Sequence, residues 1–186
     1  MKKTNIIIVG VGGQGILLTS KILGFLALKM GEQVKVSEVH GMSQRGGSVI
    51  THVRIGEDVH SPLVDPGEAD FVLSFEKLEA LRAEYFLRPG GVLISNTQEI
   101  LPMPVIMGTA AYPETAPATE KSVLLDALSL AEKAGSGRAV NIVLLGVLAR
   151  YLPWPESAWE EAIAACVPPK TLEINLNAFR AGLKEQ

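Results

Sequence analysis

The sequence contains very little cysteine. Cys166 is the only cysteine among 186 residues, so the chain cannot supply the several thiolates that an iron–sulfur cluster or an all-cysteine zinc site requires. The spacing of the three histidines, His40, His52 and His60, matches no metal-binding motif. No serine stands in a Gly-x-Ser-x-Gly elbow, which argues against a hydrolase triad. We therefore expect neither a metal ligand nor a catalytic residue in this chain.

Basic charge and long apolar runs are also scarce. Seventeen Lys and Arg residues face 20 Asp and Glu residues, and the net charge of -3 is not that of a nucleic-acid-binding surface. The apolar run Ile142–Ala149 is too short to span a membrane, and Met1–Thr4 lead into no signal-peptide-like segment. With 47% hydrophobic and 20% charged residues, we expect one folded cytoplasmic domain over residues 1–186 that binds neither nucleic acid nor membrane.

The order of the predicted elements indicates an α/β fold. Short apolar runs, many of them β-branched, predict strands at Asn5–Val9, Val34–Val39, Ser48–Ile55, Asp70–Ser74, Gly91–Ser95 and Pro104–Met107. A turn at Gly56–Asp58 predicts a short return strand and hence an antiparallel hairpin. Helices are predicted at Ile16–Met30, Glu76–Phe86 (stopped by Pro89–Gly91), Glu120–Lys133, Val140–Tyr151, Glu156–Ala165 and Lys170–Leu183, with a loop at Thr109–Ala118. We predict a Rossmann-like three-layer α/β/α domain with a mixed, mainly parallel sheet, a central first strand and a helical C-terminal part.

A glycine-rich loop joins the first strand to the first helix. Its candidate binding residues are Gly10, Gly12, Gly13, Gln14 and Gly15. Glycines allow the backbone to turn tightly and to approach a ligand, and the helix that follows presents free N–H groups and a positive dipole end. The loop therefore indicates a site for an anionic ligand. The alternative is a turn that serves only close packing of helix and strand.

Two nucleotide-binding motifs can be tested against this loop. A phosphate-binding loop of the Walker type needs Lys and then Ser or Thr after the last glycine, and Ile16 and Leu17 stand there instead. A Rossmann dehydrogenase needs an acidic residue near the end of the second strand, and Glu38 stands close to that place. A free-standing NAD-binding, nucleotide-binding or sensor domain thus stays an alternative.

A second polar segment follows the second strand. It contains Ser43, Gln44, Arg45, Gly46 and Gly47, and it should reach the same carboxyl edge of the sheet as the first loop. A guanidinium beside two glycines can hold an anion with its planar fork while the backbone comes close. These residues are candidates for the same binding site. An ordinary solvated loop is the alternative.

Four segments together resemble one known family. They are Gly10–Leu17, Ser37–Ser48, Asn141–Gly146 and Glu173–Phe179. The chain resembles the gamma subunits and gamma domains of the 2-oxoacid:ferredoxin oxidoreductases, and among them most of all the small beta subunit of the indolepyruvate enzymes. The second segment is the specific one, and the resemblance covers nearly the whole chain.

The resemblance implies a subunit of an enzyme that oxidatively decarboxylates a 2-oxoacid. Coenzyme A would take the acyl group and ferredoxin the electrons, while thiamine diphosphate and iron–sulfur clusters would belong to a larger partner subunit. The chain indeed has no Gly-Asp-Gly segment followed by Asn-Asn, as a thiamine site requires. The resemblance further implies that this chain is inactive alone, helps to cover the active site, and contacts coenzyme A.

Overall fold

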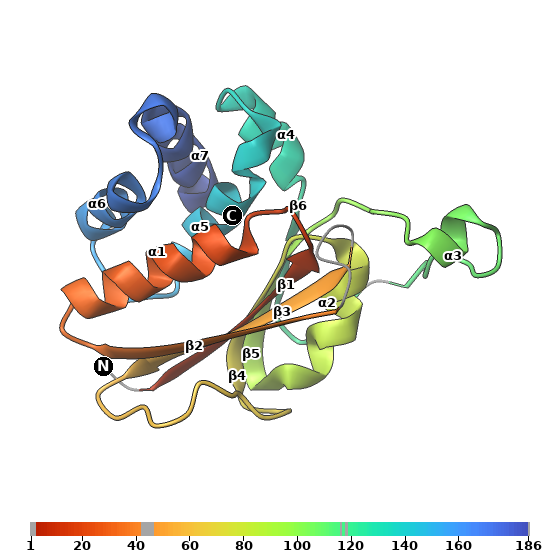
Figure 1. Cartoon of the computed structure of the whole chain (residues 1–186), viewed down its shortest axis with the longest axis horizontal. Helices are drawn as coiled ribbons and strands as arrows, with labels where there is room; N and C mark the ends of the chain where they lie inside the picture. The colour runs from red at the N-terminus through yellow and green to blue at the C-terminus, as the bar shows by residue number, and fades with distance from the viewer. Residues whose placement is uncertain (1–2, 42–46, 116, 118, 186) are drawn as a thin grey trace.

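The computed structural model describes residues 3–41, 47–115, 117 and 119–185. They form a six-stranded sheet with helices on both faces (Figure 1). In the order β2-β3-β1-β4-β5-β6, the strands are Gln33–His40, Ser48–Gly56, Thr4–Val11, Ala69–Ser74, Leu87–Asn96 and Ser122–Leu125. The helices are α1 (Ile16–Lys29), α2 (Lys77–Ala83), α3 (Met103–Ile106), α4 (Ala127–Lys133), α5 (Val140–Ala149), α6 (Glu156–Cys166) and α7 (Leu172–Lys184). This arrangement confirms the predicted three-layer α/β fold.

Strand β1 lies inside the sheet, as predicted. Ile6, Ile7 and Ile8 are fully buried because both faces of the strand are covered. Since side chains alternate along a strand, Ile6 and Ile8 join the larger core with α1 and α5, whereas Ile7 and Val9 join the smaller core under α2. The strand therefore anchors both layers of helices and fixes the position of the loop that follows it.

The sheet is mixed because of one strand. Strand β1 pairs in parallel with β4, β4 with β5, and β5 with β6, whereas β3 runs antiparallel to both of its neighbours, β1 and β2. The predicted return strand after Gly56–Asp58 was wrong, because residues 57–68 contain no strand. The antiparallel partners of β3 are instead β1 and β2, which satisfy its backbone groups on both sides.

Two further element predictions were wrong. Residues Pro104–Met107, predicted as a strand, contribute to the short helix α3, whose first turn contains Pro104. Proline suits that position because the first helical N–H groups have no partner in any case. The predicted helix Glu120–Lys133 begins only at Ala127, because β6 pairs in parallel with β5 over Ser122–Leu125. Pairing with a neighbouring strand outweighed the local helical pattern.

The end of the second predicted helix also differs. The α-helix α2 ends at Ala83 and a 3₁₀ turn spans Glu84–Phe86, after which Leu87 already begins β5. Pro89–Gly91 therefore lie within a strand and do not stop the helix.

No helix of the described residues is long and apolar enough to cross a membrane.

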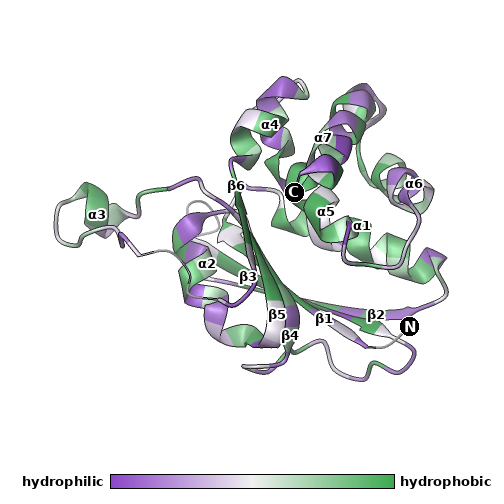
Figure 2. Ribbon diagram, turned by 180° about the vertical axis from the view of Figure 1, so that it is seen from behind, coloured by the Kyte–Doolittle hydropathy of each residue, from purple (hydrophilic) through white to green (hydrophobic). Residues whose placement is uncertain are grey.

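Helix α5 is the most deeply buried helix of the described chain. All ten of its residues are buried, and Figure 2 shows it enclosed among α1, α4 and α7. Its contact with α7 is very close, because a Cβ on Gly146 would lie 2.2 Å from the Phe179 carbonyl oxygen. A Cβ on Gly182 would likewise lie 1.9 Å from the Val143 carbonyl oxygen. The two helices can approach this closely only with glycine at both positions.

We predict that Gly182→Ala destabilises the fold by about 3 kcal/mol, because backbone atoms cannot move aside as a side chain can. Gly24→Ala is the matched control. Gly24 also lies inside a helix, but a Cβ there would meet nothing within 4 Å, so the substitution should stabilise the protein by roughly 0.5–1 kcal/mol. Urea unfolding followed by circular dichroism measures both. Equal effects of the two substitutions would contradict this account of the α5–α7 contact.

Candidate functional site

The candidate site lies at the carboxyl edge of the sheet, between β1 and β4. After β1 the chain enters α1 on one face, and after β4 it enters α2 on the other face (Figure 1). Such a change of direction leaves a crevice between the two strand ends, and open α/β sheets bind ligands there. The glycine loop lies at this carboxyl edge, as the sequence predicted, and follows directly after β1.

The glycines of the loop have different structural roles. A Cβ on Gly10 would lie 2.8 Å from Gln14 Oε1 and 3.1 Å from Phe75 Cβ, so this glycine is needed for packing. Gly15 has a φ of 86° and precedes α1, and a Cβ there would lie 2.7 Å from Asn141 Nδ2. Gly13 has a φ of 103° but faces open space. Only Gly13 therefore combines the left-handed conformation with room for a ligand.

The side chain of Gln14 holds the loop in place. Its Oε1 accepts a hydrogen bond of 2.7 Å from the Val11 amide, and its Nε2 donates one of 3.1 Å to the Phe75 carbonyl oxygen. Gln14 thus joins the end of β1 to the residue that follows β4. The sequence pattern proposed Gln14 as a binding residue, and the structure gives its amide group this bracing role.

Some backbone amides of the loop already have partners. The Gly12 amide donates to the Gly47 carbonyl oxygen at 2.9 Å, and the Gln14 amide donates to Val11 at 3.2 Å. Gly15 provides no side-chain cap for α1, and the first turn of α1 contains no acidic residue. The amides of Gly13 and of the first turn of α1 are therefore the groups best placed to receive an anion.

The second predicted segment is described only at its end. Gly47 lies beside Gly12, which places this end of the segment at the same sheet edge as the glycine loop. Ser43, Gln44, Arg45 and Gly46 lie outside the described residues. Their role in binding stays a prediction.

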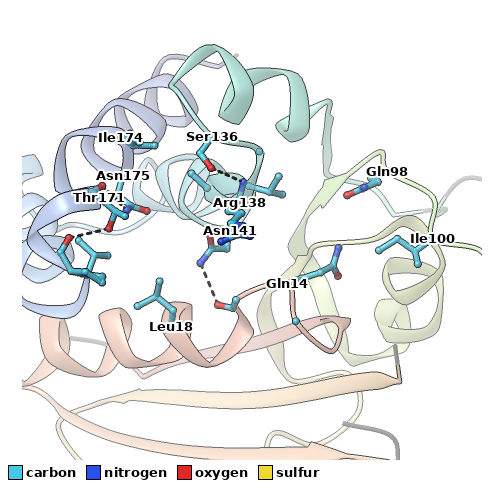
Figure 3. A pocket seen from close by; sticks show the side chains of 17 residues that line it. Gln14, Leu18, Gln98, Ile100, Ser136, Arg138, Asn141, Thr171, Ile174 and Asn175 are labelled. Carbon is cyan, nitrogen blue, oxygen red and sulfur yellow. Dashed lines mark hydrogen bonds between the residues drawn. The ribbon is translucent and has the colours of Figure 1, made fainter. Parts of the chain in front are cut away.

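A cavity of about 570 Å³ opens beside the glycine loop. Figure 3 shows that its walls come from parts of the chain far apart in sequence. Gly13, Gln14 and Gly15 form one side, and Gln98 and Ile100 line it after β5. The remaining wall comes from the start of α5 and the start of α7, and it contains Ser136, Arg138, Asn141, Thr171 and Asn175.

Arg138 is the functional candidate that the sequence interpretation missed. It belongs to a 3₁₀ turn, Gly137–Ala139, that leads into α5. Its backbone amide donates a hydrogen bond of 3.3 Å to Ser136 Oγ. Its side chain lines the cavity (Figure 3) and takes part in no ion pair among the described residues. It therefore gives the cavity a fixed positive charge. The sequence did contain a signal for this role, because Arg138 follows Ser136 and Gly137 just before the predicted helix Val140–Tyr151.

Asn141 ties this wall to the glycine loop. Its side chain is 2% exposed, and Nδ2 donates a hydrogen bond of 3.3 Å to the Gly15 carbonyl oxygen. The beginnings of α5 and α1 therefore point into the same cavity, and the positive ends of two helix dipoles meet there together with Arg138. This arrangement suits a ligand with negative charge.

A second cavity of about 470 Å³ also borders the glycine loop and is lined by Glu38 and His40 of β2. In the dinucleotide-binding fold, the strand that carries the ribose-binding acid is the direct neighbour of the first strand. Here β3 separates β2 from β1. Glu38 thus comes near the loop by a different topology from that of the dehydrogenases.

The histidines and the cysteine occupy separate places. His52 Nδ1 accepts a hydrogen bond from the Val64 amide, and burial lowers the pKa of His52 below its ordinary value. His60 is exposed beside Asp58. Cys166 is half-buried at the end of α6, and burial raises the pKa of its thiol. Among the described residues, no three His, Cys, Asp or Glu side chains gather as metal ligands would.

The fold and this edge define a doubly wound α/β domain with its candidate site at the switch point of the sheet. The family model for pyruvate ferredoxin/flavodoxin oxidoreductase matches residues 5–185. Indolepyruvate oxidoreductase subunit IorB of Thermococcus kodakarensis is 46% identical over 194 residues, which cover 99% of this chain and 96% of that protein. The chain therefore belongs to the pyruvate ferredoxin/flavodoxin oxidoreductase family, which confirms the resemblance found in the sequence.

Several solved structures share the fold. Pyruvate oxidoreductase subunit PORC from Thermotoga maritima has a TM-score of 0.77 at 23% identity, and the match covers 100% of this chain and 97% of that one. The 2-oxoglutarate:ferredoxin oxidoreductase from Magnetococcus marinus also has a TM-score of 0.77, at 19% identity, but the match covers 98% of this chain and only 31% of that one. The same fold thus occurs both as a separate small subunit and as one part of a longer chain.

We predict that Gly15→Ala destabilises the protein by about 2–3 kcal/mol. The left-handed conformation costs about 1 kcal/mol, and the new Cβ would displace Asn141 from its hydrogen bond to the Gly15 carbonyl oxygen. Gly13→Ala is the control, since it has the same kind of backbone strain without a neighbour and should cost only about 1 kcal/mol. Thermal unfolding measures the difference. An equal loss for both substitutions would show that the Asn141 contact contributes nothing.

Proposed function

We propose that this chain is the small subunit of an indolepyruvate:ferredoxin oxidoreductase. The 46% identity with the Thermococcus subunit IorB over nearly the full length of both chains carries this proposal. The reaction would break the bond between the carboxyl carbon and the 2-oxo carbon, release CO₂ and join the acyl group to coenzyme A. Two electrons would pass to ferredoxin, one at a time.

In this proposal the redox chemistry belongs to a large partner subunit that holds thiamine diphosphate and the iron–sulfur clusters. The single cysteine of this chain, Cys166, cannot supply the ligands of a cluster. What this chain offers is a positively polarised cavity at one sheet edge. We therefore assign to this chain the functions of contacting coenzyme A and of helping to cover the active site. The cytoplasmic location expected from the sequence stays a prediction.

We further propose that the edge of the sheet binds a phosphate of coenzyme A. Gly13 leaves the loop backbone open, Arg138 is without an ionic partner among the described residues, and the helices α1, α5 and α7 begin at the cavity. A volume of about 570 Å³ lies within the range of small-molecule sites. Arg45, with the backbone of Gly46 and Gly47, would complete the anion-binding corner from the neighbouring loop.

The alternative function is a free-standing NAD-binding or sensor domain. One observation supports it, because Glu38 and the glycine loop line the second cavity together. The strand order favours the subunit, because β3 occupies the place of the acid-bearing strand. Calorimetric titration of the purified chain with NAD distinguishes the two, since only the alternative requires binding without a partner.

We predict that Arg138→Ala, in the reconstituted enzyme, raises the KM for coenzyme A by tenfold to a hundredfold. Such a change corresponds to the loss of one charge-assisted hydrogen bond, about 1.5–3 kcal/mol. Arg138→Lys should restore only part of the affinity because lysine lacks the planar fork. Arg88→Ala is the control, since Arg88 pairs with Asp70 near the amino end of β4 and away from this cavity. An unchanged KM for Arg138→Ala would remove Arg138 from the site.

We predict that Arg45→Ala also raises the KM for coenzyme A in the reconstituted enzyme. Complex formation with the large subunit is the second measurement, and the substitution should weaken it. The isolated variant should unfold at the wild-type temperature, because the sequence predicts a polar loop at Arg45 and a solvated arginine contributes little to stability. If both the coenzyme A dependence and assembly match wild type, this loop takes no part in binding. If the isolated chain unfolds instead, Arg45 has a structural role.

We also predict that the isolated chain turns over no 2-oxoacid, even with thiamine diphosphate, coenzyme A and ferredoxin added. The reason is that it lacks the cluster-binding cysteines and the thiamine motif. Ferredoxin reduction, followed by absorbance, measures this directly. Turnover by the chain free of any partner would refute the proposed division of labour.

A further inference from the structure

An arm of residues 97–112 projects from the body of the protein. It leaves the end of β5, carries α3 at its tip and returns toward β6 (Figure 1). No residue of α3 is buried, and four large apolar side chains of the arm are exposed: Leu101 (48%), Met103 (62%), Ile106 (61%) and Met107 (69%). Figure 2 shows the same hydrophobic tip at a distance from the sheet and its helices. These side chains are therefore open to solvent when the chain is alone.

The composition of the arm is that of an interface core. From Ile100 to Pro113 there is no charged residue, in a chain in which 20% of the residues are charged. The cores of protein–protein interfaces are depleted of charge and enriched in methionine, whose flexible side chain adapts to the shape of a partner. A solvated loop of this length would normally carry charge. The arm therefore has the features of a surface that is covered in an assembly.

The tip is ordered by its own hydrogen bonds. The Pro102 carbonyl oxygen accepts from the Val105 amide at 2.9 Å, and the Pro104 carbonyl oxygen accepts from both the amide and the hydroxyl of Thr109, at 2.9 and 3.0 Å. These bonds close the turn of α3 without help from the body. A preformed tip loses little conformational entropy when it binds.

The base of the arm is clamped by Glu76, a carboxylate that is only 1% exposed. Its Oε1 accepts hydrogen bonds from the Ile100 amide at 3.0 Å and from the Tyr112 hydroxyl at 2.5 Å, so it holds both ends of the arm. Its Oε2 accepts from the Glu79 amide in the first turn of α2. Burial, and next the bond to Glu76, raise the pKa of Tyr112 above its ordinary value. The base is thus fixed to the body while the tip extends.

The position of the arm indicates its partner. Gln98 and Ile100, at its base, line the cavity beside the glycine loop. We propose that the arm docks its apolar tip into an apolar groove of the large thiamine-binding subunit of the same enzyme. This inference rests on the proposed function. If the chain is the small subunit, the sheet edge that carries the cavity must face the large subunit. In the Magnetococcus enzyme, the matching part is 31% of a longer chain, so a domain of this fold there adjoins other parts of one enzyme.

A second copy of this chain is the competing occupant. The outer face of α1 exposes Phe25 (42%) and Leu28 (65%), and it could receive an arm from a neighbour. Reciprocal contact of each arm with α1 of the other copy would give a closed pair, whereas an unreciprocated contact would give a ring or an open filament. We favour the large subunit because Gln98 and Ile100, at the base of the arm, lie at the edge of the cavity.

The test compares two substitutions at similarly exposed side chains. Met107→Ser changes the tip of the arm, and Leu28→Ser changes the outer face of α1. The affinity of each purified variant is measured for the large subunit separated from the native complex. We expect Met107→Ser to raise the Kd about tenfold and Met103→Ser with Ile106→Ser and Met107→Ser to raise it more than a hundredfold. Met107→Leu should restore wild-type affinity, and all variants should keep the wild-type unfolding temperature.

The outcomes separate this inference from the proposed function. If wild-type chain binds the large subunit and the triple variant binds equally well, the docking arm is refuted while the function stands. If Leu28→Ser weakens binding as much as Met107→Ser, the arm has no special role and the inference also fails. If the wild-type chain self-associates through the arm, as shown by loss of oligomers in the triple variant, a second copy is the occupant. If wild-type chain binds no large subunit at all, the proposed function itself fails.

Discussion

The burial of α5 is the constraint on which the rest of the structure depends. All ten residues of this helix are buried, so no face of it can turn to water. It must lie between the sheet and the outer helices, and Gly146 and Gly182 let α7 close over it. Its position brings Asn141 to the Gly15 carbonyl oxygen. The shape of the glycine loop thus depends on a helix that lies more than a hundred residues away in the sequence.

The sequence predicted the fold best where local pattern and tertiary position agree. The β-branched run of β1 and the apolar α5 can exist only as buried elements, and both were found where expected. Prediction failed where a neighbouring strand decides the structure. Ser122–Leu125 lies in a local helical pattern, and pairing with the edge of β5 makes it a strand instead. The short helix α3 depends on proline geometry at the tip of the arm, where none of its residues is buried, so no hydrophobic period marks it.

The residues of the candidate site also divide into those that the sequence predicted and those that it missed. Its glycine loop was visible because turns and helix starts are local features, and Gly47 confirmed that the second segment ends beside it. Arg138 was missed because only the packing of α5 brings it to the loop. Glu38 shows the opposite case. Its distance along the chain from the glycine loop suits a dinucleotide site. In the structure, however, the antiparallel strand β3 lies between β1 and the strand β2 that carries Glu38. Spacing alone cannot reveal strand order.

The cavity and the docking arm share one sheet edge, and this has a thermodynamic consequence. Gln98 and Ile100 belong to both, since they line the cavity and form the base of the arm that Glu76 clamps. If the docked arm holds this base in the conformation that binds coenzyme A, association with the large subunit tightens the binding of coenzyme A. Linkage then requires coenzyme A to tighten subunit association by the same factor. Under the proposed function, the small subunit would in this way make the binding of the acyl acceptor depend on an assembled enzyme.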